Sequence, residues 1–147
     1  MRMSNGLEKR QSQCHNQPDA YAAHTNAVWG CYYYLNNLET TACTVPGNAW
    51  INMCRATYDE VPGYWGLHRH IADVDGHGQC GGSASSYSMH VANAVNSIIG
   101  WCTDCRSRNI PGSSYRENYC SATGLEAAYG NGCFAVLVAG GSNWNNQ

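Results

Sequence analysis

The chain has 147 residues, of which 44 % are hydrophobic and only 12 % are charged. This length suits one ordinary domain, and the hydrophobic share is too high for a disordered segment. The formal net charge of −2 provides neither the basic stripe that binds phosphates nor a polybasic membrane anchor. We therefore do not expect nucleic acid to be a partner of this protein.

The first half of the chain predicts one helix and two strands. A helix is expected from about Asp19 to Leu38, although Gly30 within it is less typical of helices. The apolar residues at helical spacing in this segment are Tyr21, Val28, Tyr32 and Leu35. After a turn at residues 46–48, strands are expected over residues 49–57 and, more exposed, over residues 64–72.

The second half of the chain contains the clearest helical pattern, which follows a glycine- and serine-rich segment over residues 76–88. Its apolar stripe consists of Val91, Val95, Ile98 and Cys102, at i, i+4, i+7 and i+11. We expect a cap from one of three serines, Ser85, Ser86 and Ser88, and a disulfide from Cys102 to a strand.

The C-terminal third predicts mostly loops and one buried strand. Residues 106–131 are expected to be loop-rich, with a short strand around 115–121. The apolar run over residues 133–139 is typical of a central strand. This order of elements predicts an α+β class: a disulfide-stapled, single-domain α/β sandwich with helices packed on one face of a mainly antiparallel sheet.

Nine cysteines are spread through almost the whole chain, at Cys14, Cys31, Cys43, Cys54, Cys80, Cys102, Cys105, Cys120 and Cys133. Such spacing favours disulfides formed in an oxidising compartment, with zinc ligation or free thiols as the alternatives. Eight paired cysteines allow 105 connectivities, so the pairing stays open. The odd count leaves one thiol free, in an intermolecular bond, or paired with a cysteine that this sequence does not include.

The N-terminal segment indicates secretory processing. It has no apolar signal-peptide core, and no stretch of the chain approaches the roughly 20 apolar residues of a membrane span. Lys9-Arg10, preceded by an acidic residue, is typical of a pro-protein processing site, with a chance dibasic pair as the alternative. We therefore expect a pro-segment remnant over residues 1–10, a cysteine-rich domain over residues 11–147, and an extracellular, secreted protein. The sequence does not indicate the oligomeric state.

The densest group of metal-capable side chains lies in the middle of the chain and comprises His68, His70, Asp73, Asp75 and His77. In an extended segment, His68 and His70 face the same side and can share a transition metal such as zinc. A calcium loop is excluded because its twelfth position is Ala84 instead of a bidentate glutamate. A polar surface strand is the alternative that we favour, and no cofactor is expected.

No catalytic residues are assigned. The chain lacks a Gly-x-Ser-x-Gly elbow, and its scattered carboxylates form no distinctive pair. The Cys102-x-x-Cys105 pair follows a helix, where the helix dipole does not lower a thiol pKa, so redox chemistry is not expected. Two half-cystines bonded to different partners explain this pair better.

Aromatic composition favours a binding surface. The chain has five Trp and ten Tyr against one Phe, which is a bias toward rings with a polar handle. The runs 32–34 and 64–65, together with Trp144, are candidate platforms for sugars or a protein partner, with core packing as the alternative. The partner-binding candidates are Arg69, Arg106, Arg108, Tyr64 and Trp65.

Taken together, these features resemble fungal cysteine-rich secreted effectors, and among them the killer-toxin-like proteins: the smut-virus toxin and its necrosis-effector relatives. The resemblance rests on Lys9-Arg10, the segment from Gly78-Gln79-Cys80-Gly81 into helix residues 90–96, Cys102-x-x-Cys105, and the strand over residues 133–138. It implies an α/β sandwich with split βαβ units, no catalytic machinery and action from outside the cell. Channel-directed toxins of this type use exposed basic residues, whereas this chain is slightly acidic.

Three functions therefore follow as hypotheses. The first is a non-enzymatic effector or toxin, with a role in virulence, that binds an extracellular protein, a membrane or a cell-wall target. The second is a small secreted hydrolase that uses the His/Asp group as a metal site. The third is a cell-wall carbohydrate-binding protein built on tyrosine and tryptophan platforms.

Overall fold

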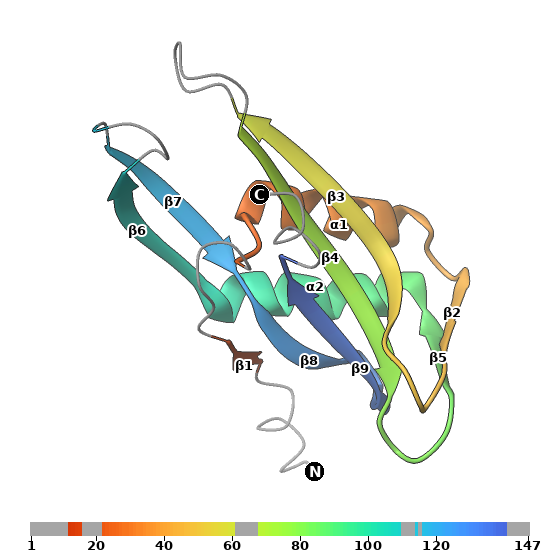
Figure 1. Cartoon of the computed structure of the whole chain (residues 1–147). Coiled ribbons are helices and arrows are strands. Elements are labelled where there is room, and N and C mark those ends of the chain that lie inside the picture. Colours follow the sequence, from red (N-terminus) through yellow and green to blue (C-terminus); the bar gives the residue numbers. More distant parts are fainter. Residues whose placement is uncertain (1–11, 16–21, 61–67, 110–113, 115, 141–147) are drawn as a thin grey trace.

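The computed structural model describes residues 12–15, 22–60, 68–109, 114 and 116–140, and shows an α+β protein (Figure 1). Its two helices are α1 (Thr25–Asn37) and α2 (Ser88–Cys102). The strands are β1 (Gln13–Cys14), β2 (Ala42–Val45), β3 (Ile51–Glu60), β4 (His68–Gly78), β5 (Ala84–Tyr87), β6 (Thr103–Asn109), β7 (Arg116–Ala122), β8 (Gly124–Ala128) and β9 (Asn131–Ala139). The predicted α+β class is therefore confirmed.

The main sheet has five strands in the order β1-β8-β9-β4-β3, and every neighbouring pair is antiparallel. Strand β9, the apolar run of the C-terminal third, lies between β8 and β4, as its composition predicts. Two further antiparallel pairs, β2-β5 and β6-β7, lie beside this sheet (Figure 1).

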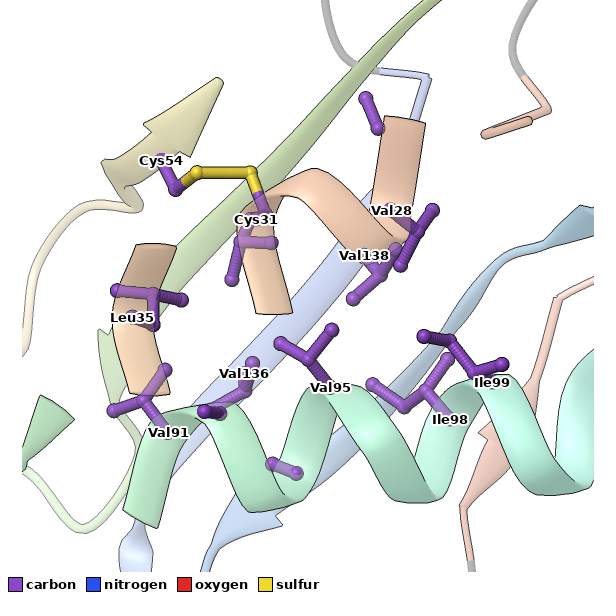
Figure 2. Packing of buried hydrophobic residues seen from close by; sticks show 14 of the residues in the cluster. Val28, Cys31, Leu35, Cys54, Val91, Val95, Ile98, Ile99, Val136 and Val138 are labelled. Carbon is purple, nitrogen blue, oxygen red and sulfur yellow. A yellow bond between two sulfur atoms is a disulfide. The ribbon is translucent and has the colours of Figure 1, made fainter. Parts of the chain in front are cut away.

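Both helices pack against the same face of the five-stranded sheet. Val74 pairs with Val138 across β4 and β9, and both are fully buried in the core. Figure 2 shows Val138 together with core residues of both helices. The stripe of α2 predicted from its spacing is buried, which confirms this helix. Gly30 allows α1 to approach β3 closely, because a Cβ atom at this position would lie 3.1 Å from the Cβ of Ala56.

Four disulfides join the elements: Cys14–Cys102, Cys31–Cys54, Cys80–Cys133 and Cys105–Cys120. Cys43 is the remaining, free thiol. The predicted disulfide framework is confirmed. Cys102 ties the end of α2 to strand β1, and Cys105 bonds within the β6-β7 hairpin, so this close pair does have different partners. Among the described residues, no helix is long and apolar enough to cross a membrane.

Two predictions about these elements are wrong. Residues 106–131 are not loop-rich, because β6, β7 and β8 account for most of their described part. Strand β6 lies outside the main sheet and its described side chains are exposed, so hydrophobic periodicity does not reveal it. No serine caps α2: Tyr87 occupies the N-cap position, and the Ser88 hydroxyl donates to the carbonyl of Thr41. The serine-rich stretch before this helix instead forms strand β5.

The strands predicted over residues 49–57 and 64–72 correspond to β3 and β4, which both extend further along the chain. Helix α1 starts at Thr25 instead of Asp19, with His24 at its N-cap. The processing site at Lys9 and Arg10, and the Tyr64-Trp65 pair, lie outside the described residues.

Candidate functional site

An open pocket of about 370 Å³ lies where β5, the first turn of α2 and the β8-β9 turn meet. The residues lining it are Ala42, Ser85, Ser86, Tyr87, His90, Tyr129, Gly130 and Asn131. Its volume is within the range of about 300–1,000 Å³ that is usual for small-molecule sites. It is therefore the candidate functional site.

Three aromatic rings shape this pocket. The ring of His90 lies 5.3 Å from that of Tyr87 and 5.3 Å from that of Tyr129, measured between centroids. The histidine is partly buried, whereas Tyr87 and Tyr129 are 47 % and 54 % exposed. Two large aromatic side chains thus contact the same imidazole while still facing water.

The backbone holds these rings in place. The N–H of Tyr129 donates to the carbonyl of His90 at 3.3 Å, which ties the β8-β9 turn to the first turn of α2. Asn131 Nδ2 donates to the carbonyl of Ser85 at 2.9 Å, and its Oδ1 accepts the N–H of Cys133 at 3.0 Å. Gly130 completes the turn with a φ of 77°, a conformation that glycine adopts without strain.

The lining of the pocket combines aromatic rings with polar groups and contains no Asp, Glu, Lys or Arg. Within the part of the chain that the structure describes, the Ser86 hydroxyl and the His90 ring nitrogens make no hydrogen bond. These groups can donate to or accept from a ligand. The pocket can therefore bind a neutral, polar molecule between ring faces and hydrogen-bonding groups.

The predicted metal group is divided between the two faces of β4. His70 faces the helices and is 8 % exposed, and its ring lies 4.6 Å from that of His24. Asp73 and Asp75 interact with β3 side chains instead, and His77 stacks on Trp50 at 4.9 Å. The side chain of His68 lies outside the described ones. Among the described residues, no three His, Cys, Asp or Glu side chains gather as a metal site.

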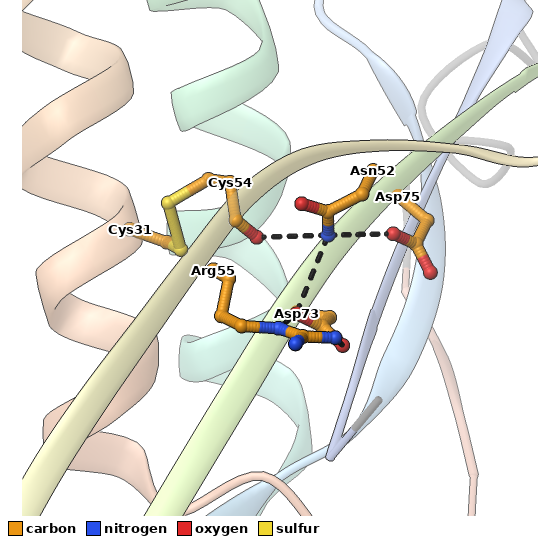
Figure 3. A network of polar contacts seen from close by, with 6 residues as sticks. All are labelled: Cys31, Asn52, Cys54, Arg55, Asp73 and Asp75. Atoms are coloured by element: carbon orange, nitrogen blue, oxygen red, sulfur yellow. Dashed lines mark hydrogen bonds and ion pairs between the residues drawn. A yellow bond between two sulfur atoms is a disulfide. The ribbon is translucent and has the colours of Figure 1, made fainter. Parts of the chain in front are cut away.

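Asp73 and Asp75 belong to a polar network with β3 (Figure 3). Arg55 donates to both oxygens of Asp73, at 2.7 and 3.0 Å, and this contact raises the pKa of Arg55. Asn52 Nδ2 lies 3.3 Å from Asp73 Oδ1, 3.0 Å from Asp75 Oδ1 and 3.2 Å from the carbonyl of Cys54. Burial raises the pKa of the Asp75 carboxyl. The network braces β3 against β4 where their register shifts, between Asn52 and Cys54.

A second buried polar group surrounds the start of α1. Its rings come from the α1 N-cap and from strands β3, β4 and β7, and belong to His24, Tyr58, His70 and Tyr119. His24 Nδ1 accepts the N–H of Asn26 at 3.1 Å, which caps α1 in the way that serine or asparagine usually does. These contacts join the β6-β7 hairpin to the main sheet.

The two basic partner-binding candidates whose side chains are described lie on different sheets, Arg69 on β4 and Arg106 on β6. Arg69 forms an ion pair with Asp59 across β4 and β3, 3.0 Å between Nε and Oδ1, and this hydrogen bond lowers the pKa of Asp59. Arg106 pairs with Asp104 within β6. The side chain of Arg108, like those of Tyr64 and Trp65, is outside the described ones.

The aromatic run over residues 32–34 lies on α1. Trp29, Tyr32 and Tyr33 contact one another there, with ring centroids 5.2 to 5.8 Å apart. Tyr33 and Tyr34 are exposed, but the pocket does not include them. Trp144 lies outside the described residues.

Sequence analysis missed the residues of the pocket. Tyr87 and Tyr129 stand alone in the sequence, and His90 lies on the polar side of α2, so none forms a motif. The only available signal was the excess of tyrosine over phenylalanine. Comparison with family models, curated proteins and solved structures finds no match to this chain. Its function therefore has to be inferred from its own residues.

Proposed function

We propose that the protein is a secreted, non-enzymatic effector or toxin-like protein that acts by binding an extracellular or host target. The observation that carries this proposal is the pocket of Tyr87, His90 and Tyr129, which combines exposed aromatic faces with polar groups. Exposed tyrosines held by backbone contacts are typical of binding surfaces, because their large rings lose little conformational entropy on binding.

The disulfide framework supports action outside the cell. Four disulfides link residues that are 15 to 88 positions apart in the chain, and such bridges persist in oxidising compartments. They are compatible with an extracellular protein that must keep its shape without the protection of the cell. The α/β sandwich with split βαβ units that the killer-toxin-like resemblance implies is part of this proposal.

A binding experiment tests the proposed function. The oxidised, full-length protein, labelled at its N-terminal amine, is incubated with intact fungal and plant cells, and surface-bound label is measured against protein concentration. We expect saturable binding that unlabelled protein displaces. The double variant Tyr87→Ala/Tyr129→Ala should lose this binding, whereas Tyr33→Ala, which removes an exposed tyrosine outside the pocket, should retain it.

Two outcomes would contradict the proposal: no saturable binding to any cell surface, or undiminished binding by the double variant. Circular dichroism and urea unfolding establish that each variant folds before its binding is interpreted.

The hydrolase hypothesis draws no support from the described residues, because β4 separates His70 from Asp73, Asp75 and His77. Stoichiometric metal in the purified protein, with turnover that is lost in His70→Ala, would favour it over the binding function.

A further inference from the structure

We propose that the pocket of Tyr87, His90 and Tyr129 binds a neutral glycan, with pyranose rings stacked on the two tyrosine faces. This inference rests on the proposed function and deepens it, because it names the chemical class of the target that the same pocket recognises.

The aromatic walls provide the stacking surfaces. One face of a pyranose ring presents C–H bonds with a slight positive charge, and the face of an aromatic ring carries negative charge. Tyr87 and Tyr129 keep about half of their surface exposed, so a sugar ring can cover them and displace water from both partners. Each ring also contacts His90, which restricts its orientation.

The polar groups match hydroxyls. The Ser86 hydroxyl and the His90 ring nitrogens have no hydrogen-bond partner in the described part of the protein, and both kinds of group can donate or accept. Asn131 uses one amide hydrogen and one oxygen lone pair for Ser85 and Cys133, so one position on each amide atom remains for a ligand. A sugar presents several hydroxyls around its edge, and each of them can donate to or accept from such groups.

The charge of the lining selects a neutral ligand. A sulfated or phosphorylated ligand would call for Arg or Lys, and a cationic ligand would call for a carboxylate beside the rings, but the lining has neither. A uronic acid would likewise lack an Arg or Lys partner in the lining, whereas neutral hexoses and N-acetylhexosamines carry no charge that needs one. The chemistry of the pocket therefore favours an uncharged glycan.

The site is held in its shape before binding. The β8-β9 turn is hydrogen-bonded to α2 through Tyr129 and His90, and to β5 through Asn131 and Ser85. The disulfide Cys80–Cys133 fixes β9 two residues after Asn131. Little conformational entropy remains to be lost when a glycan binds.

Isothermal titration calorimetry of the oxidised, full-length protein tests the proposal. The probes are neutral oligosaccharides of the chitin, β-glucan, cellulose and mannan types, with heparin and a phosphorylated mannan as charged controls. We expect at least one neutral series to bind, and affinity to fall by about tenfold or more in Tyr87→Ala and in Tyr129→Ala. Tyr87→Phe and Tyr129→Phe keep the ring faces, so their affinities should stay within about threefold of the parent. Tyr33→Ala should bind as the parent does.

Three results would overturn the proposal: no neutral series binds, only the charged polymers bind, or a neutral series binds equally well to Tyr87→Ala and Tyr129→Ala. The cell-binding experiment separates this failure from that of the proposed function. If periodate oxidation of cell-surface sugars leaves binding intact while the double alanine variant abolishes it, the pocket binds a target that is not a glycan. The effector function then stands and the glycan inference falls.

Discussion

Replacing both cysteines of the Cys31–Cys54 disulfide by alanine tests how much the buried bridge between α1 and β3 contributes to stability. Its natural control is the Cys105–Cys120 disulfide, whose loop has a similar length: the sequence separations are 23 and 15. Loop closure in the unfolded chain then accounts for about 3.4 kcal/mol in the first case and about 3 kcal/mol in the second. If the two measured losses of stability differ by more than these loop-closure values do, the excess reports the environment of the sulfur atoms.

The two bridges differ in burial. Cys31 and Cys54 lie in the hydrophobic core (Figure 2), at 0 % and 8 % exposure. Cys105, by contrast, is exposed and Cys120 is only partly buried. Truncating two buried side chains costs a further packing energy of about 0.5–1.5 kcal/mol each. We therefore expect Cys31→Ala/Cys54→Ala to lower the free energy of unfolding by about 4.5–6 kcal/mol and Cys105→Ala/Cys120→Ala by about 3 kcal/mol.

Urea unfolding followed by circular dichroism measures both losses. All proteins carry Cys43→Ser, which removes the remaining thiol and prevents disulfide exchange. With an m value of about 2 kcal/mol/M, the two double variants should differ in midpoint by roughly 1 M. Equal midpoints would refute the reasoning, because they would mean that the core closes around the missing sulfurs at no cost. A lower midpoint for the hairpin variant would refute it as well.

The remaining predictions concern the buried polar groups and the core. Asp73→Asn should lower the free energy of unfolding by about 1.5–3 kcal/mol, because its carboxylate accepts two hydrogen bonds from Arg55. Asp75→Asn should instead gain stability relative to the parent as pH rises: burial raises the pKa of this carboxyl, so its ionisation costs stability above the unfolded value of about 3.9. Urea unfolding between pH 3 and pH 7 checks this, and a constant difference would contradict it. His24→Ala should cost about 1 kcal/mol for the lost cap of α1, part of which His24→Asn should restore in thermal unfolding. Phe134→Ala should cost about 3–5 kcal/mol, because this side chain is fully buried; a loss below 1 kcal/mol would show that it does not hold the core.

Helix α2 and strand β9 could be predicted from their residues alone. The stripe from Val91 to Cys102 repeats with the period of a helix, and the run after Cys133 is apolar on both faces. Both elements lie in the core, where burial of apolar area determines structure and leaves a pattern in the sequence. Strand β6 leaves no such pattern, because its polar residues pair with β7 outside the core.

The contacts of the histidines show why a short sequence motif does not determine a functional site. His70 and His77 lie on the same strand, and a sequence motif groups them, yet alternation sends them to opposite faces. His24, which no motif connects to His70, is the ring that His70 contacts. A contact such as that between His24 and His70 depends on which strands and helices are neighbours in the fold. The separation of two residues in the sequence does not tell which elements become neighbours.

The amino-acid sequence by itself determined the class of this protein, since cysteine number, apolar share and periodicity already predict a disulfide-linked α+β chain. Only the tertiary structure decided which cysteines pair, and it brought Tyr87, His90 and Tyr129 together from two separate parts of the chain. The physical reason is the distance along the chain over which the interactions act. Secondary structure follows from neighbours within a few residues, whereas a pocket forms where distant segments pack, and that packing is set by the burial of the whole core.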